Sequence, residues 1–315
     1  QAGGDITING DLITEVTNAQ HIVDARTTVI AFSDGAGSSG GDIALNGNLI
    51  KTEVTGNAFN VDVRSLAIAV NGNVTQAVNN TIQAVGDGVS DAFVQAGLFT
   101  GVIGRVIPGG QSDGSVIFRL GSGDISQSGT VEAIGQGAGS VRVRGSVIAA
   151  GDGVTNLTGG NVSLNSTGSI IAIGQGLGTA SEASFVDIEA RAGAGGNLVQ
   201  ASGHAITVTG EALDSASYSG VVEANIGLFT GLEIPVGTAS YITFAGGNIT
   251  AAGTNTVTAV GDQGASYNSI EAIAYGNSGA GGDVNVTGGT FAVSASRTAS
   301  IGGSFSYAEA SVEFL

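Results

Sequence analysis

A short motif recurs along the whole chain: one or two glycines, then Asp or Asn, then an aliphatic residue, as in Gly3-Gly4-Asp5-Ile6. The Asp or Asn of the eight clear copies is Asp5, Asp42, Asn73, Asp124, Asn161, Asn197, Asn248 and Asp283. Five of the seven intervals between them are 31 to 37 residues long, and the other two are 51. Such periods are typical of repeat proteins, in which each unit buries its apolar face against its neighbours.

The repeat divides the chain into units that start near residues 3, 40, 71, 121, 159, 195, 246 and 281. Both 51-residue units contain the tetrapeptide Leu-Phe-Thr-Gly, at 98–101 and 228–231, followed by the only two prolines, Pro108 and Pro235. A super-repeat of about 124 residues accounts for this duplication. We expect residues 1–315 to form a single elongated repeat domain, with the tetrapeptides on excursions from its wall or on longer β-hairpins.

Each unit carries about three short runs in which apolar and polar residues alternate, such as Ile6-Thr7-Ile8, Val61-Asp62-Val63 and Ala84-Val85-Gly86-Asp87. Alternation with period two predicts strands with one buried face, and the glycines between them predict tight turns. We therefore predict an all-β fold, a repetitive parallel β-solenoid whose Asp and Asn residues stack in a column at a turn. Tandem β-sandwiches or other stacked-sheet domains remain the alternative.

Composition excludes several classes of protein. Glycine is abundant at 55 residues, but hydrophobic residues make up 42% of the chain, which is too many for a disordered segment. The net charge of −17 opposes binding to nucleic acid or to an anionic membrane. No apolar run is long enough for a membrane helix, so we expect no membrane insertion. The absence of cysteine excludes a disulfide framework.

The run from Gly159 to Ile173, with Gly-Gly-Asn-Val followed by further glycine and aliphatic residues, resembles the repeats of filamentous-haemagglutinin-like and autotransporter-type bacterial surface proteins. The resemblance implies an exported parallel β-helix at the cell surface. The family's usual coil is shorter, so one unit here corresponds to two coils or to one large coil. Because the chain begins at Gln1, we expect a secreted, extracellular protein whose signal peptide has been removed.

Both ends of the chain read as ordinary repeat strands without a polar cap. Open ends of this kind recruit further strands, and a head-to-tail contact that does not close gives a filament. We therefore predict a structural protein, a homopolymer whose C-terminal strand pairs with the N-terminal coil of the next copy. The predicted assembly residues are Asp5, Ile6, Ile8, Phe305, Tyr307, Val312 and Phe314.

Two other functions compete with the fibre. The first is a cell-surface adhesin module that binds a host or surface ligand through Phe99 and Phe229, unless both are core residues of a longer coil. The second, more remote, is a polysaccharide-active β-helix enzyme with Asp187 and Glu189 as its carboxylates. His21 and His204 lie in no recognisable catalytic motif, and Trp is absent. We therefore predict no catalytic residues and no enzyme.

Calcium is the one cofactor that the sequence hints at. Asp87 and Asp152 lie in Gly-Asp-Gly turns, which resemble fragments of calcium-binding repeats. The nine-residue period of those repeats is missing, so an Asx turn without a metal is the alternative. No other cofactor is expected.

Overall fold

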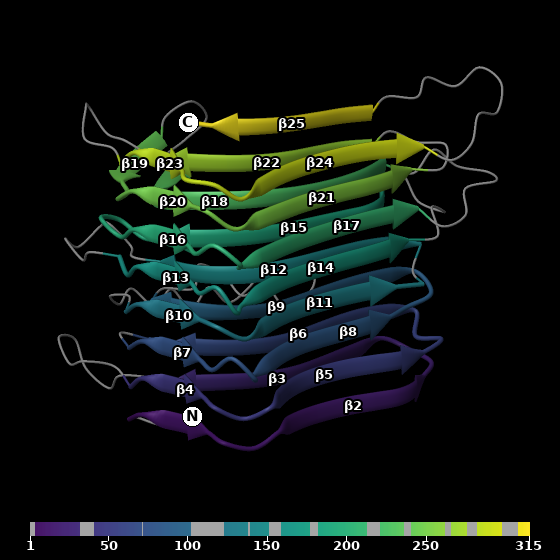
Figure 1. Cartoon of the computed structure of the whole chain (residues 1–315). Coiled ribbons are helices and arrows are strands. Elements are labelled where there is room, and N and C mark those ends of the chain that lie inside the picture. The colour runs from purple at the N-terminus through teal and green to yellow at the C-terminus, as the bar shows by residue number, and fades with distance from the viewer. Residues whose placement is uncertain are drawn as a thin grey trace.

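The computed structural model describes residues 4–31, 41–70, 72–101, 123–137, 139–150, 159–176, 182–212, 221–235, 241–261, 266–275, 282–297 and 308–315. Within these ranges the chain is all-β and contains no helix. The strands lie in three sheets of eight parallel strands, and the layers rise from the N-terminal to the C-terminal end of the molecule (Figure 1).

Sheet 1 consists of three-residue strands, each of which begins at the aliphatic residue of one copy of the Gly-Asx-aliphatic motif. In spatial order they are β1 (Ile6–Ile8), β4 (Ile43–Leu45), β7 (Val74–Gln76), β10 (Ile125–Gln127), β13 (Val162–Leu164), β16 (Leu198–Gln200), β20 (Ile249–Ala251) and β23 (Val284–Val286). The register places motif aliphatics directly above one another, as with Ile6 and Ile43.

Sheets 2 and 3 hold the longer strands. Sheet 2 contains β2 (Leu12–Ala19), β5 (Leu49–Gly56), β8 (Thr81–Asp87), β11 (Thr130–Gln136), β14 (Ser169–Gly176), β17 (Ala205–Ala212), β21 (Thr254–Gly261) and β24 (Thr290–Arg297). Sheet 3 contains β3 (Val23–Ala31), β6 (Asn60–Ala69), β9 (Asp91–Gly101), β12 (Ser140–Ala150), β15 (Glu182–Ala192), β18 (Val221–Pro235), β22 (Ser266–Ala274) and β25 (Ala308–Phe314). A further strand, β19 (Tyr241–Ala245), pairs antiparallel with the end of β18.

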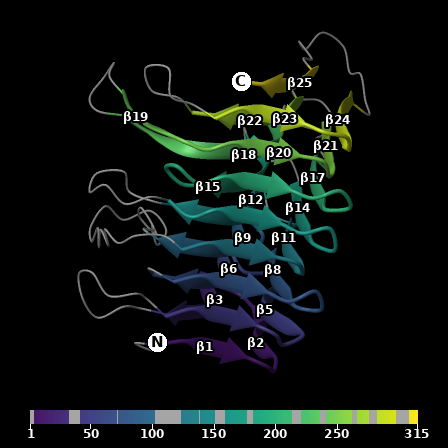
Figure 2. The ribbon, with the colours of Figure 1, turned by 60° about the vertical axis from the view of Figure 1, so that its left-hand side comes forward.

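Each repeat unit contributes one strand to each sheet, in chain order (Figures 1 and 2). We call the three strands of one unit a coil and number the coils 1 to 8 from the N-terminus. One unit of about 36 residues therefore corresponds to one large coil and not to two. Parallel pairing within all three sheets is consistent with a parallel β-solenoid. It contradicts the β-sandwich alternative, which requires antiparallel sheets.

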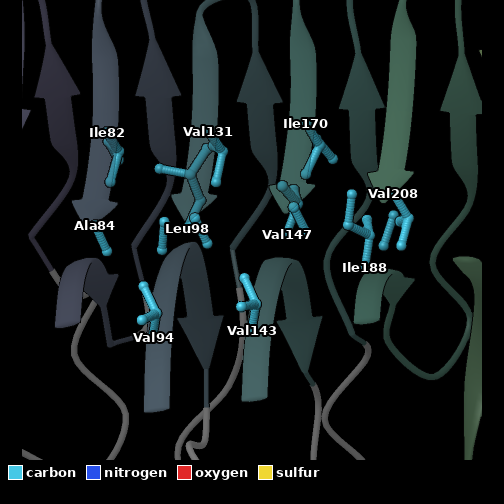
Figure 3. Packing of buried hydrophobic residues seen from close by; sticks show 14 of the residues in the cluster. Ile82, Ala84, Val94, Leu98, Val131, Val143, Val147, Ile170, Ile188 and Val208 are labelled. Atoms are coloured by element: carbon cyan, nitrogen blue, oxygen red, sulfur yellow. The ribbon is translucent and has the colours of Figure 1, made fainter. Parts of the chain in front are cut away.

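The core runs through the stack between the sheets. Along most strands the buried and less buried residues alternate, as in β14, where Ile170 and Ala172 are fully buried. Figure 3 shows valines, leucines and isoleucines of sheets 2 and 3 that meet in this interior, among them Leu98, Val131 and Ile188. Stacking thus buries aliphatic side chains that no single coil could cover.

Small residues are needed where sheet 2 approaches sheet 3. Gly86, Gly135 and Gly174 lie side by side in adjacent strands. A Cβ atom at any of them would lie within 3.0 Å of a valine side chain of sheet 3. This explains the recurring Ala-aliphatic-Gly run. The similar run at residues 259–261 is shifted in register by two, because Ala259 and not Gly261 lies beside Gly210 of the same column.

The two long units were expected to differ at their Leu-Phe-Thr-Gly segments. That expectation is wrong for the tetrapeptides themselves, which lie in the wall within β9 and β18 and pair with the strands on either side. The hairpin interpretation holds for the second long unit, since β18 runs on to Pro235 and turns back as β19. Residues 102–122 of the first long unit, including Pro108, lie outside the described residues.

The body is not elongated along the stack. Eight coils at about 4.8 Å each give a height of about 38 Å, and an 11-residue strand such as β12 spans about 36 Å. Among the described residues, no helix is long and apolar enough to span a membrane.

Candidate assembly interface

The glycine of the Gly-Asx-aliphatic motif forms a column without side chains along one corner of the stack. In coils 2 to 8 a Cβ atom on the motif glycine would lie within 3.0 Å of an atom of the coil below. For Gly41, Gly72 and Gly282 that atom is the carbonyl oxygen of the equivalent glycine. Glycine is therefore required wherever one coil lies on another, because any side chain would push the coils apart.

The Asp and Asn residues that follow these glycines form a polar ladder. The Oδ1 atom of each accepts a hydrogen bond from the backbone N–H of the Asx one coil above. The donor–acceptor distance is 3.0 Å from Asp42 to Asp5 and 2.9 Å from Asp283 to Asn248. The intermediate steps, at 2.8 or 2.9 Å, involve Asn73, Asp124, Asn161, Asn197 and Asn248 as donors. The expected Asx column is thus confirmed, and all seven steps run in the same direction.

The backbone hydrogen bonds of sheet 1 also repeat from coil to coil, and they run in both directions. The N–H of each motif aliphatic donates upward to the Asx carbonyl of the next coil, from Ile6 to Asp42 at the bottom and from Ile249 to Asp283 at the top, at 2.8 and 2.9 Å. Three residues later in each unit, an N–H donates downward to the coil below, as from Asn46 to the carbonyl of Ile8 at 2.8 Å. Every internal joint between coils therefore repeats one set of donors and acceptors.

The stack is open at both ends of the described chain. In the interior of sheet 1 the motif aliphatics are almost fully buried, with Ile43 and Ile125 each 1% exposed. At the bottom, Ile6 and Ile8 of β1 are only half-buried. At the top, Val284 is half-buried and Val286 is 42% exposed. The apolar columns of the core thus reach the surface at each end.

The predicted assembly residues do not all belong to matching strands. Asp5, Ile6 and Ile8 lie at the bottom of sheet 1, whose top strand is β23. The C-terminal strand β25 is instead the top of sheet 3, whose bottom strand is β3. In β25 Val312 is 39% exposed and Phe314 is 43% exposed.

Two further predicted assembly residues, Phe305 and Tyr307, lie outside the described residues. If the sheets continued in register from copy to copy, Ile6 and Ile8 would therefore lie against β23, and the C-terminal strand β25 would lie against β3.

Comparison with known proteins gives no relative. No family model, no curated protein and no solved structure matches the chain.

The two phenylalanines proposed as exposed anchors are packed on the outer face of sheet 3. Phe99 is 9% exposed and lies in an apolar cluster with Leu66, Ile68 and Val70. Phe229 is half-buried, and the guanidinium of Arg191 lies 4.6 Å from its ring centre. The interpretation that both are packed residues of the wall therefore fits better than the interpretation that both are free contacts.

The tetrapeptide has a structural explanation. Leu228 points into the core and is fully buried, Phe229 folds back over Gly227, and the Thr230 hydroxyl donates to the carbonyl of Gly247 at 2.6 Å. The first copy does the same, with Thr100 donating to Gly123 at 2.7 Å. The threonine therefore ties the end of a sheet 3 strand to the glycine that opens the next coil.

The metal candidates are not brought together, whereas the two catalytic candidates, Asp187 and Glu189, lie on the same outer face of β15. Asp87 is half-buried, and burial raises the pKa of its carboxyl. No group of three His, Cys, Asp or Glu side chains that could hold a metal occurs in the described ranges. Asp152 lies outside them.

Burial raises the pKa of the catalytic candidate Asp187 to about 6, while Glu189 accepts a hydrogen bond from Arg191 at 2.5 Å.

A buried polar cluster at the corner between sheets 1 and 2 was not anticipated. His21 is exposed, but the imidazole of His204 is fully buried, and burial lowers its pKa to about 4. Its Nε2 lies 2.7 Å from Oε1 of Gln127, and its Nδ1 lies 3.5 Å from Nε2 of Gln200. The repeated glutamine of sheet 1 (Gln76, Gln127, Gln200) was the available signal for this cluster.

Proposed function

We propose that this chain is a parallel β-solenoid that serves as a structural subunit of an extracellular fibre, and that copies assemble head to tail through the open ends of the stack. The observation that carries the proposal is that apolar residues of the core are partly exposed at both ends of the stack. Ile6 and Ile8 at the bottom and Val284 and Val286 at the top have almost fully buried equivalents in the interior coils.

The chemistry of the ends favours this use. Edge strands present unpaired N–H and C=O groups that pair readily with further strands. The two ends are different surfaces, so a contact between the top of one copy and the bottom of another leaves both outer ends free. Such a contact continues without closing and produces a filament.

The proposed location and class rest on the sequence. The resemblance to filamentous-haemagglutinin-like and autotransporter-type surface repeats supports export, and a chain without cysteine tolerates an oxidising environment. We propose a structural and not a catalytic role. The buried side chains of Gln127 and His204 are engaged in hydrogen bonds within the stack.

The test is assembly of the purified protein as a function of concentration. Sedimentation velocity and negative-stain electron microscopy should show monomers at low concentration and unbranched filaments above a threshold. Added salt should lower the threshold, because it screens the repulsion between copies that each carry a net charge of −17. A protein that remains monomeric at millimolar concentration in high salt would contradict the proposal.

A second candidate function has its own observation. Ile22, Phe59 and Val89 are 75, 59 and 53% exposed, and they lie at the corner between sheets 2 and 3 in the first three coils. Backbone hydrogen bonds connect these turns, from Phe59 to His21 and from Val89 to Ala58. An exposed apolar ridge of this kind suits an adhesin that binds an apolar surface or ligand.

Adhesion through the ridge is tested with Phe59→Ser. The variant should bind less to hydrophobic beads than the wild type, while it assembles normally. As a matched control, Val199→Ser changes an apolar residue that is 44% exposed on sheet 1, away from the ridge. Equal losses of bead binding in both variants would show that the ridge has no special role.

A further inference from the structure

We infer that the filament joint is an additional coil-on-coil contact of sheet 1, in which Gly4 and Asp5 of one copy lie directly on Gly282 and Asp283 of another. This inference rests on the proposed function and specifies its interface. The joint would repeat the hydrogen bonds and close approach of the seven internal joints, so that sheet 1 continues from copy to copy without interruption.

The first argument is the hydrogen-bond polarity of the ladder. At the bottom the N–H of Asp5 has no partner among the described residues, and at the top the same holds for the side-chain oxygens of Asp283. Each internal step joins these same two groups, a lower Asx oxygen and an upper Asx N–H. One copy therefore has an unused donor at its bottom, the N–H of Asp5, and an unused acceptor at its top, the carboxylate of Asp283. These two groups would bond to each other where the bottom of one copy lies on the top of another.

The second argument is the backbone of the edge strands. Following the internal pattern, the N–H of Val284 would donate to the carbonyl of Asp5 in the next copy, and the N–H of Asn9 would donate to the carbonyl of Val286. The internal counterparts are Ile249 to Asp283, at 2.9 Å, and Thr287 to Ala251, at 3.0 Å. Two backbone hydrogen bonds thus accompany the side-chain bond at the joint.

The third argument is steric. A Cβ atom on Gly4 would meet nothing within 4 Å, although the same substitution at Gly41 or Gly282 would bring it within 3.0 Å of a glycine carbonyl below. Among the described residues of one copy, nothing therefore requires glycine at position 4 for steric reasons. On the top coil of a second copy such a reason exists, because the Cα of Gly4 would then lie against the carbonyl of Gly282.

The apolar columns match as well. Continuing the register places Ile6 above Val284 and Ile8 above Val286. In sheet 2 it places Leu12 above Phe291, which is half-buried and packs against the core from the top. Contact in this register would cover the exposed ends of the core columns, and burial of that apolar surface favours association.

The decisive variant is Gly4→Ala. The added methyl group has free space in a single copy, so the thermal unfolding temperature of the monomer should equal that of the wild type. At the joint it would meet the carbonyl of Gly282, so the concentration at which filaments form should rise at least ten-fold. Thr75→Ala, a small change at an exposed position of sheet 1 in coil 3, should alter neither property.

The opposite end gives a second, independent variant pair. Asp283→Ala removes the acceptor of the ladder and should also raise the threshold for assembly. Asp283→Asn keeps the Oδ1 acceptor, which asparagine supplies at four internal steps of the ladder, and removes a negative charge that would face Asp5. It should assemble at the wild-type threshold or below.

Mixing provides a readout that a folding defect cannot imitate. A Gly4→Ala copy retains an intact top, so it should add to the bottom of a wild-type filament and block further growth there. Substoichiometric amounts should therefore shorten wild-type filaments.

The outcomes separate the inference from the proposed function. If wild-type protein forms filaments and Gly4→Ala forms them at the same threshold, the inferred joint is wrong while the fibre proposal stands. If the wild type forms none, the fibre proposal itself fails.

Discussion

Within a single repeat unit, the motif glycine and the following Asx residue have separate tasks. The glycine lets two coils approach, since a methyl group at Gly41 would collide with the carbonyl of Gly4. The Asx residue then uses its side-chain oxygen to bond the backbone of the coil above. Both tasks depend on a neighbouring coil, which is why the motif marks every unit of the chain.

The Gly-Leu-Phe-Thr-Gly segment predicts a specific coupling between two residues. A Cβ atom on Gly227 would lie within 3.0 Å of the Phe229 ring. Gly227→Ala should therefore lower the free energy of unfolding by about 1–3 kcal/mol. In a Phe229→Ala background the same substitution should change it by less than about 0.5 kcal/mol, because the ring is gone. Urea unfolding of the four proteins measures the coupling, and additive effects would contradict the packing described for the ring.

His204 predicts an acid-sensitive fold. Burial holds its folded-state pKa near 4, below the unfolded value of 6.5, so the unfolded chain binds more protons between these limits. Its contribution to stability should therefore be full above pH 6.5 and fall as the pH is lowered to 4, by at most about 3 kcal/mol.

A natural control exists for this histidine. Asn80 lies four residues after Gln76, as His204 lies four residues after Gln200, and it bonds that glutamine. His204→Asn should remove the acid-dependent loss that the histidine causes. Urea unfolding at pH 7.5, 5.5 and 4.5 measures it, and parallel pH dependence in both proteins would contradict the assignment.

Among the elements, the three strands of each coil follow from local sequence patterns. Alternating runs such as 6–8, 61–63 and 84–87 indicated strands, and each lies in the sheet that its order in the unit requires. The position of the Leu-Phe-Thr-Gly segment within sheet 3 could not be predicted from such local patterns. The role of its threonine depends on a hydrogen bond from the Thr230 hydroxyl to Gly247, which lies on the far side of an antiparallel hairpin.

Burial of His204 was equally hidden from sequence. The histidine sits in a turn, and its main partner Gln127 is 77 residues away in the chain. The two side chains meet only because the coils stack in one register, so no local pattern could indicate the contact. The sequence did indicate that the strands near both ends of the chain lack a polar cap. The topology was needed to show that β1 and β23 are the two edge strands of sheet 1, and that β3 and β25 are those of sheet 3.

The strand-end contact of Thr230 gives an element-scale prediction. Thr230→Val keeps the shape of a fully buried side chain but removes the hydrogen bond to Gly247. It leaves a buried carbonyl without this donor and should lower the free energy of unfolding by about 1–2 kcal/mol. Thr230→Ser should lose less, because it retains the hydroxyl. Equal losses would show that only packing matters, and thermal or urea unfolding distinguishes the two.

For the whole molecule, the number of coils in one copy determines the distance between successive copies along an assembled filament. A copy is about 38 Å tall, because eight coils stack at about 4.8 Å. If the last coil of one copy supports the first coil of the next, no gap separates them. The filament would then be one uninterrupted stack, and its diameter would be that of a single copy.

The most direct measurement is the helical rise of wild-type filaments by cryo-electron microscopy. The coil-on-coil joint predicts a rise of about 38 Å per copy together with a continuous layer spacing of about 4.8 Å. A rise well above this value, as in beads separated by linkers, would contradict end-to-end stacking. So would a filament two copies wide in which the open ends face solvent.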